Sequence, residues 1–179
     1  SDWCDLRSID VGSHHHPKFK NETIPTLEDV FELLGNRVFY DIELKEHGNG
    51  TTALSEEVSR IIHACSLESR CMVTSFNPIS LRKMNRIDPT IPTGVIYSRS
   101  PNIPFLLRHG EGSFLARCDV LKPNRKQTSR AVVTLNHRFF SRSVVAWTVD
   151  KREEAETLFN RGVDAIVSNV PETLLDIAR

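Results

Sequence analysis

The chain has 179 residues, and its 23 lysines and arginines balance its 23 aspartates and glutamates, so the formal net charge is zero. A chain of this length fits one domain, and a hydrophobic fraction of 39% with a charged fraction of 26% is typical of a folded globular protein. Zero net charge argues against binding to nucleic acid through overall basicity. We therefore expect no nucleic-acid partner.

The cysteines and the apolar runs restrict the cellular setting. No apolar run approaches the ~20 residues of a membrane-spanning helix, and the first residues do not form a signal peptide. The four cysteines form no CxxC pair and have no histidine at zinc spacing: Cys4, Cys65, Cys71 and Cys118. Scattered thiols indicate reduced cysteines, which predicts a cytoplasmic protein; a disulfide-stapled secreted domain is the alternative.

Short β-rich runs alternate with amphipathic helices along the chain. The clearest helix starts after Thr26, an N-cap with Asp29 three residues later, and stops at Gly35. Further helices are predicted around 56–65, 78–84, 101–109 and 128–140, from a cap at Asp150 to Gly162, and from Pro171 onwards. Six strands are predicted at 37–45, 71–76, 93–97, 119–121, 143–149 and 163–168.

This alternation predicts the fold class. Strands separated by helices form βαβ units and a parallel sheet, so the class is α/β. Two architectures compete: an open doubly wound sheet and a βα barrel. The sequence has no glycine-rich nucleotide fingerprint, which disfavours the first. An eight-stranded barrel takes ~250 residues, so a barrel built from this chain would be incomplete.

The first predicted strand carries charged side chains on one face. Because side chains alternate along a strand, its apolar residues share one face with Tyr40, and its charged residues share the other: Asp41, Glu43 and Lys45. In a βα barrel the apolar face packs on helices, and the charged face points to the axis near the catalytic end. A carboxylate beside a lysine suits a divalent cation next to an anionic substrate. The alternative is a solvated edge strand with a salt bridge.

Polar or aromatic residues also end the other predicted strands. Ser75 and Phe76 end one strand, Trp147 lies in another, and Ser168 and Asn169 end the last. Together they indicate the catalytic rim of a barrel, although a core position would suit Trp147 equally well. Among the histidines, His47 is a weak rim candidate, and the run at 14–16 reads as a polar loop closed by a proline.

The sequence resembles glycerophosphodiester phosphodiesterases in five runs, which occur in the order found in that family: 24–30, 41–45, 75–76, 147–150 and 162–169. Residues 6–12 also resemble the segment that precedes the first of these runs in the family. The resemblance implies a (β/α)8 TIM-type barrel, here about strands 4–8, with residues 1–179 as the C-terminal part of one barrel domain. It implies hydrolysis of a glycerophosphodiester to an alcohol and glycerol 3-phosphate, with Mg²⁺ or Ca²⁺ as cofactor.

The resemblance also assigns site residues. It implies that Glu43 is a metal ligand, that Lys45 faces the phosphate and that Trp147 lines the substrate pocket. Ser75 and Asn169 are further candidates for substrate binding. Asp150 stands where the family usually has asparagine, and Asn169 stands where aspartate is common.

The sequence lacks three motifs of the family: His-Arg-Gly, a Glu-x-Asp metal pair and His-Asp. The resemblance therefore implies no catalytic histidine in this chain, and we expect the chain alone to be inactive. Two alternatives stay open: a non-catalytic module that associates with itself or another chain through an open sheet edge, and a related phosphodiesterase acting on lysophospholipids.

Overall fold

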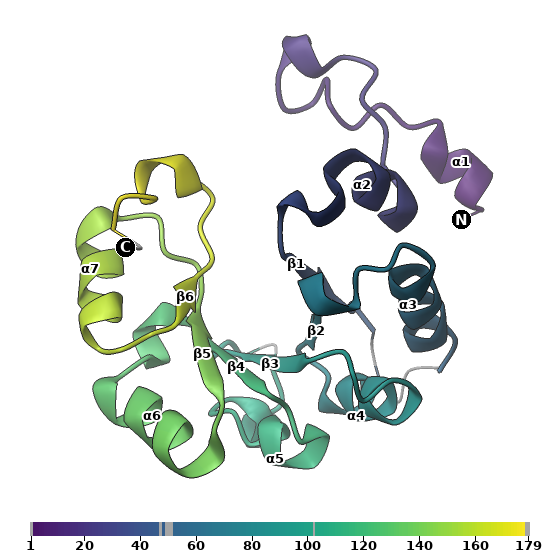
Figure 1. The fold of residues 1–179 in the computed structure, drawn as a ribbon. Helices are drawn as coiled ribbons and strands as arrows, with labels where there is room; N and C mark the ends of the chain where they lie inside the picture. Colours follow the sequence, from purple (N-terminus) through teal and green to yellow (C-terminus); the bar gives the residue numbers. More distant parts are fainter. Residues whose placement is uncertain (1, 47, 49–51, 102, 178–179) are drawn as a thin grey trace.

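A computed structural model describes residues 2–46, 48, 52–101 and 103–177. Its centre is one parallel sheet of six strands in sequence order, which curls into part of a barrel (Figure 1). The strands are β1 (Tyr40–Glu43), β2 (Cys71–Ser75), β3 (Thr93–Tyr97), β4 (Val120–Pro123), β5 (Ser143–Ala146) and β6 (Ala165–Ile166). The predicted α/β class, the incomplete barrel and the six strands are confirmed; six strands are one more than strands 4–8 would supply.

Helices connect successive strands and cover the outer face of the sheet (Figure 1). They are α3 (Ala53–Ala64), α4 (Pro78–Ile87), α5 (Gly112–Ala116), α6 (Arg130–Leu135) and α7 (Arg152–Asn160). Before the sheet come α1 (Trp3–Arg7) and α2 (Leu27–Leu34). No described helix is long and apolar enough to cross a bilayer.

The apolar core lies between the outer face of the sheet and these helices. Completely or almost completely buried side chains come from both layers, among them Ile62 on α3, Leu81 and Met84 on α4, Val73 on β2 and Val144 on β5. This burial fixes the strand register, because a shift by one residue would turn the apolar side chains to the concave face.

The capping box predicted for α2 is confirmed. The Thr26 hydroxyl accepts from the Asp29 amide at 3.0 Å, and the Asp29 carboxylate accepts from the Thr26 amide at 2.9 Å. Hydrogen bonding of the Asp29 carboxylate to the Thr26 backbone amide, and then to the Thr26 side chain, lowers the pKa of Asp29. The capping box thus fixes the start of α2, the helix that precedes β1.

One predicted helix cap was wrong, and two predicted helices are shorter than expected. The cap of α7 is Lys151, without a side-chain hydrogen bond, because the Asp150 carboxylate binds Asn169 instead. The chain from Pro171 forms a short 3-10 helix, Pro171–Thr173, and within 101–109 the helical part is the 3-10 turn Phe105–Leu107.

On the outer surface, His63 joins α3 to the loop after α4. Its Nε2 lies 2.6 Å from the Asp88 carboxylate and its Nδ1 lies 2.7 Å from Glu68. The bond with Asp88, followed by the bond with Glu68, raises the pKa of His63. Burial alone would raise the pKa of Asp88, but its hydrogen bonds with Thr90, His63 and Ser59 lower it to about 2.

This cluster predicts a pH-dependent stability. Because the pKa of His63 is higher in the folded state than in the unfolded state, protonated His63 stabilises the fold. This contribution is complete below the unfolded-state pKa of 6.5 and is lost as the pH rises through the folded-state pKa. We expect His63→Gln to be most destabilising below that pH and progressively less so above it, in urea unfolding at several pH values. His14→Gln, in the N-terminal loop, is the matched control. An equal effect of His63→Gln at acid and alkaline pH would contradict the role of the charge.

Candidate active site

Strand β1 presents its charged side chains to the concave face of the sheet, as the alternation predicts. Tyr40 and Leu44 are buried on the helix side, whereas Asp41, Glu43 and Lys45 are partly or fully exposed on the other. Glu43 ends the strand and Lys45 follows in the loop, so both lie at the C-terminal end where βα barrels hold their sites.

A cavity of about 660 Å³ opens at this end. Glu43, Lys45 and Ser75 are among the residues that line it. An apolar wall completes it, formed by Phe76, Pro78, Ile79, Pro104, Leu107 and Leu115. Neither the Glu43 carboxylate nor the Lys45 ammonium has a hydrogen bond or ion pair with a described residue. Both charges are therefore available to a ligand; His47 lies outside the described residues.

Ser75 is buried, and its hydroxyl is used within the protein. The hydroxyl donates to the Leu44 carbonyl at 2.7 Å and accepts from the Asn77 amide at 3.0 Å. These bonds tie the end of β1 to the end of β2 and to the start of α4. Ser75 thus shapes the cavity beside Glu43, and its direct contact with substrate stays a prediction.

Trp147 follows β5 and lies beside the cavity wall without lining the cavity itself. Its indole Nε1 donates to the Lys122 carbonyl at 2.9 Å, and its ring meets Phe76 edge-on at 5.6 Å between centroids. The peptide bond between Trp147 and Thr148 is cis. Trp147 therefore reaches the cavity through Phe76, and its role in lining the substrate pocket stays a prediction.

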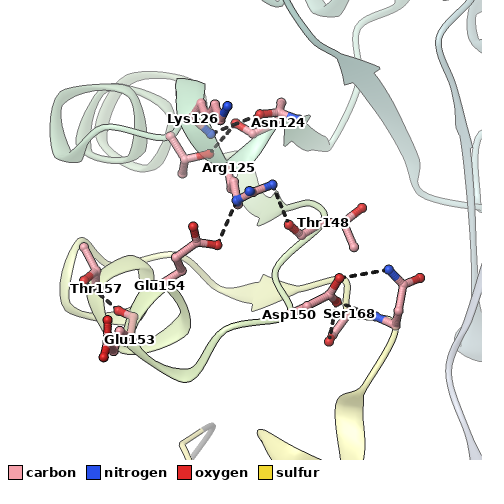
Figure 2. Close-up of polar contacts among 11 residues, drawn as sticks. Asn124, Arg125, Lys126, Thr148, Asp150, Glu153, Glu154, Thr157 and Ser168 are labelled. Carbon is pink, nitrogen blue, oxygen red and sulfur yellow. Dashed lines mark hydrogen bonds and ion pairs between the residues drawn. The ribbon is translucent and has the colours of Figure 1, made fainter.

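Asn169 lies with Asp150, not with Glu43 or Lys45. The Asp150 carboxylate accepts from the Asn169 amide at 2.8 Å, from the Asn169 side chain at 3.0 Å and from the Ser168 hydroxyl at 3.1 Å. The bonds with Asn169 lower the pKa of Asp150. Figure 2 shows Asp150 at the junction of the segments after β5 and β6. A contact of Asn169 with substrate stays a prediction.

Arg125 supports the same junction from the loop after β4. Its guanidinium lies 2.8 Å from the Glu154 carboxylate and donates to the Thr148 carbonyl at 3.1 Å (Figure 2). Its backbone amide donates to the Trp147 carbonyl at 2.7 Å. The segment that carries Trp147 is thus held by Arg125 on the β4 side and by the bonds of Asp150 with Asn169 on the β6 side.

A polar cluster on the concave face was not predicted from the sequence. Lys122 of β4 is 5% exposed and its ammonium pairs with the Asp41 carboxylate. The Thr74 hydroxyl of β2 donates to Asp41 at 2.8 Å and accepts from Lys122 at 3.5 Å. The alternation of β4 would have placed Lys122 on the concave face, but only the curl of the sheet brings it to Asp41. The cluster holds β1 two residues before Glu43.

The sequence profile of the Glycerophosphoryl diester phosphodiesterase family matches residues 1–173. The chain belongs to this family. Among the similar proteins, the glycerophosphodiester phosphodiesterase of Caldanaerobacter subterraneus is 26% identical over 98% of this chain and 70% of its own length. That of Bacillus altitudinis is 26% identical over 97% of this chain and 70% of its own length.

Solved structures of the family share the fold. An Oleispira antarctica phosphodiesterase in complex with the product sn-glycerol-3-phosphate superposes with a TM-score of 0.76 at 23% identity, over 99% of this chain and 70% of that one. A glycerophosphodiester phosphodiesterase from Parabacteroides distasonis gives a TM-score of 0.73 at 20% identity, over 99% and 70%. At these identities the likeness establishes the fold of this chain alone.

The donor set of the domain fits part of a divalent-cation site. No described group of three or more histidine, cysteine, aspartate or glutamate side chains could hold a metal ion. Asp41 is neutralised by Lys122, so Glu43 is the unpaired carboxylate on this strand. Hard cations such as Mg²⁺ prefer carboxylate oxygens and often take one or two from the protein, with water and phosphate oxygens completing the shell. Glu43 can supply one such ligand.

Proposed function

We propose that the cavity lined by Glu43 and Lys45 is the substrate- and cation-binding part of a site that hydrolyses glycerophosphodiesters to an alcohol and glycerol 3-phosphate. The observation that carries the proposal is that Glu43 and Lys45, neither of which pairs with a described residue, line the same cavity at the C-terminal end of β1. Membership of the phosphodiesterase family supports it, as does the product held by the Oleispira antarctica relative.

The two side chains have complementary tasks. Glu43 would hold the divalent cation, Mg²⁺ or Ca²⁺, which supplies a Lewis acid for the phosphoryl group. Lys45 donates charge-assisted hydrogen bonds to phosphoryl oxygens and offsets the negative charge that grows there during hydrolysis. The ion pair of Asp41 with the buried Lys122 keeps β1 in place beneath them.

A binding experiment tests this site. The chain has two tryptophans, so Trp3→Phe leaves Trp147 as the sole indole, a fluorescent reporter beside the cavity. In that background we expect sn-glycerol 3-phosphate with Mg²⁺ to change the emission, and Lys45→Met to weaken binding about tenfold or more, since hydrogen bonds to charged groups contribute roughly 1.5–3 kcal/mol.

Lys20→Met makes the same change in the exposed N-terminal loop and is the matched control. Equal binding by the Lys45→Met and Lys20→Met variants would overturn the assignment of Lys45. An absence of any binding at millimolar product would overturn the site itself.

Turnover is expected to be absent from the isolated chain. Acid–base catalysis of phosphodiester cleavage needs groups that accept and donate protons, and no described residue that lines the cavity is a histidine. We expect no hydrolysis of glycerophosphocholine by the purified chain, measured by release of choline. Turnover that Glu43→Ala abolishes would contradict this expectation and would place complete acid–base machinery within these residues.

The apolar wall of the cavity favours a second substrate class. Ile79, Leu107 and Leu115 line the same space as Glu43, and they would suit the acyl chain of a lysophospholipid. Competition against sn-glycerol 3-phosphate separates the two: lysophosphatidylcholine should compete better than glycerophosphocholine if the acyl chain occupies this wall. Self-association through an open sheet edge, and a cytoplasmic location, stay predictions.

A further inference from the structure

A second pocket lies between α4 and α5 on the outer surface, outside the concave face that carries Glu43. It has a volume of about 500 Å³. Its lining is three arginines, an asparagine and a small apolar group: Arg82, Asn85, Arg86, Phe114, Leu115, Ala116 and Arg117. The Asn85 amide donates to the Ala116 carbonyl at 2.7 Å, which fixes one helix against the other.

The three arginines are exposed, and none has a hydrogen bond or ion pair with a described residue. The lining contains no carboxylate. Elsewhere on this surface arginines pair with acids, as Arg60 does with Glu57 and Arg152 with Asp176. In a chain of zero net charge, the pocket is therefore a local concentration of unbalanced positive charge, which attracts anions.

Exposed apolar side chains adjoin these arginines. Phe114 is 59% exposed and Leu115 is 46% exposed. Phe114 meets Phe140 edge-on at 5.3 Å, and the Arg142 guanidinium lies 5.0 Å from the Phe114 ring centroid. Solvent-exposed aromatic and aliphatic side chains next to arginines are typical of protein surfaces that bind the headgroup region of a membrane.

Leu115 lines both this pocket and the cavity that contains Glu43 and Lys45. The basic pocket therefore adjoins the apolar wall of the candidate active site. A flat partner that covers the basic pocket would lie next to the mouth of that cavity.

We propose that Arg82, Arg86, Arg117, Phe114 and Leu115, here called the basic-apolar patch, dock the protein on the surface of an anionic phospholipid bilayer. The charge of the patch matches lipid phosphates, and the exposed rings match the boundary between headgroups and acyl chains. A free phosphate ion would leave Phe114 and Leu115 without a partner. The proposal does not depend on the proposed reaction.

Vesicle flotation with the full chain tests the proposal. We expect binding to vesicles of phosphatidylserine mixed with phosphatidylcholine, and little binding to phosphatidylcholine alone. Each of Arg82→Gln, Arg86→Gln and Arg117→Gln should weaken partitioning about fivefold, and the triple variant about a hundredfold. Salt should weaken binding by the wild type. Arg7→Gln, on α1, is the matched control and should bind as the wild type does.

A fluorescent variant reports on the apolar part of the patch independently of the arginine variants. Phe114→Trp should shift its emission to shorter wavelength with the anionic vesicles, whereas Phe39→Trp, an exposed position immediately before β1, should not. Three results would overturn the proposal: equal binding by the triple variant and the wild type, equal binding to neutral and anionic vesicles, or tighter binding to a DNA duplex than to the anionic vesicles.

Discussion

Asp41→Asn is expected to lower the free energy of unfolding by about 3 kcal/mol, because it leaves the Lys122 ammonium buried without its counter-charge. The ammonium side chain is 7% exposed, while the Asp41 side chain is 31% exposed, which places the effect at the lower end of the range for buried pairs. Urea unfolding at neutral pH measures the loss.

The partner substitution identifies the cause. Lys122→Met fills the same space without a charge, so in the Asp41→Asn background it should restore most of the lost stability. In the wild-type background it should be destabilising, since Asp41 then loses its counter-charge. Additive effects of the two substitutions would contradict a direct interaction between them.

The position of Glu43 and Lys45 could be predicted because it follows from a local rule. Alternation along a strand assigns each side chain to a face, and the buried Tyr40 and Leu44 settle which face meets the helices. The capping box at Thr26 is local in the same way. Such features depend only on a few residues that are close together in the sequence, so they can be predicted from it.

The Lys122 cluster could not be predicted in this way. Lys122 and Asp41 are 81 residues apart, and β4 is not a neighbour of β1 in the sheet. Their contact depends on how strongly the sheet curls, which is a property of the whole packed core. The misplaced cap of α7 has a similar cause: a local cap was expected at Asp150, but the distant Asn169 binds its carboxylate. Tertiary contacts override local preferences at both places.

Trp147→Ala is expected to lower the free energy of unfolding by about 2 kcal/mol, because the half-buried indole supports both the Lys122 carbonyl and Phe76. Trp147→Phe keeps an aromatic ring against Phe76 but leaves the carbonyl without its donor, so the expected loss is about 1 kcal/mol. Urea unfolding of the two variants separates the packing contribution from the hydrogen bond.

Trp3 provides the control for this experiment. It lies on α1, which buries no residue, and it is 40% exposed, so Trp3→Ala should cost clearly less than Trp147→Ala. Because Phe76 lines the cavity, Trp147→Ala should also weaken the binding of sn-glycerol 3-phosphate, measured by calorimetry. If Trp147→Ala lowered stability but left binding unchanged, Trp147 would be a packing residue, and the expectation that it lines the substrate pocket would be wrong.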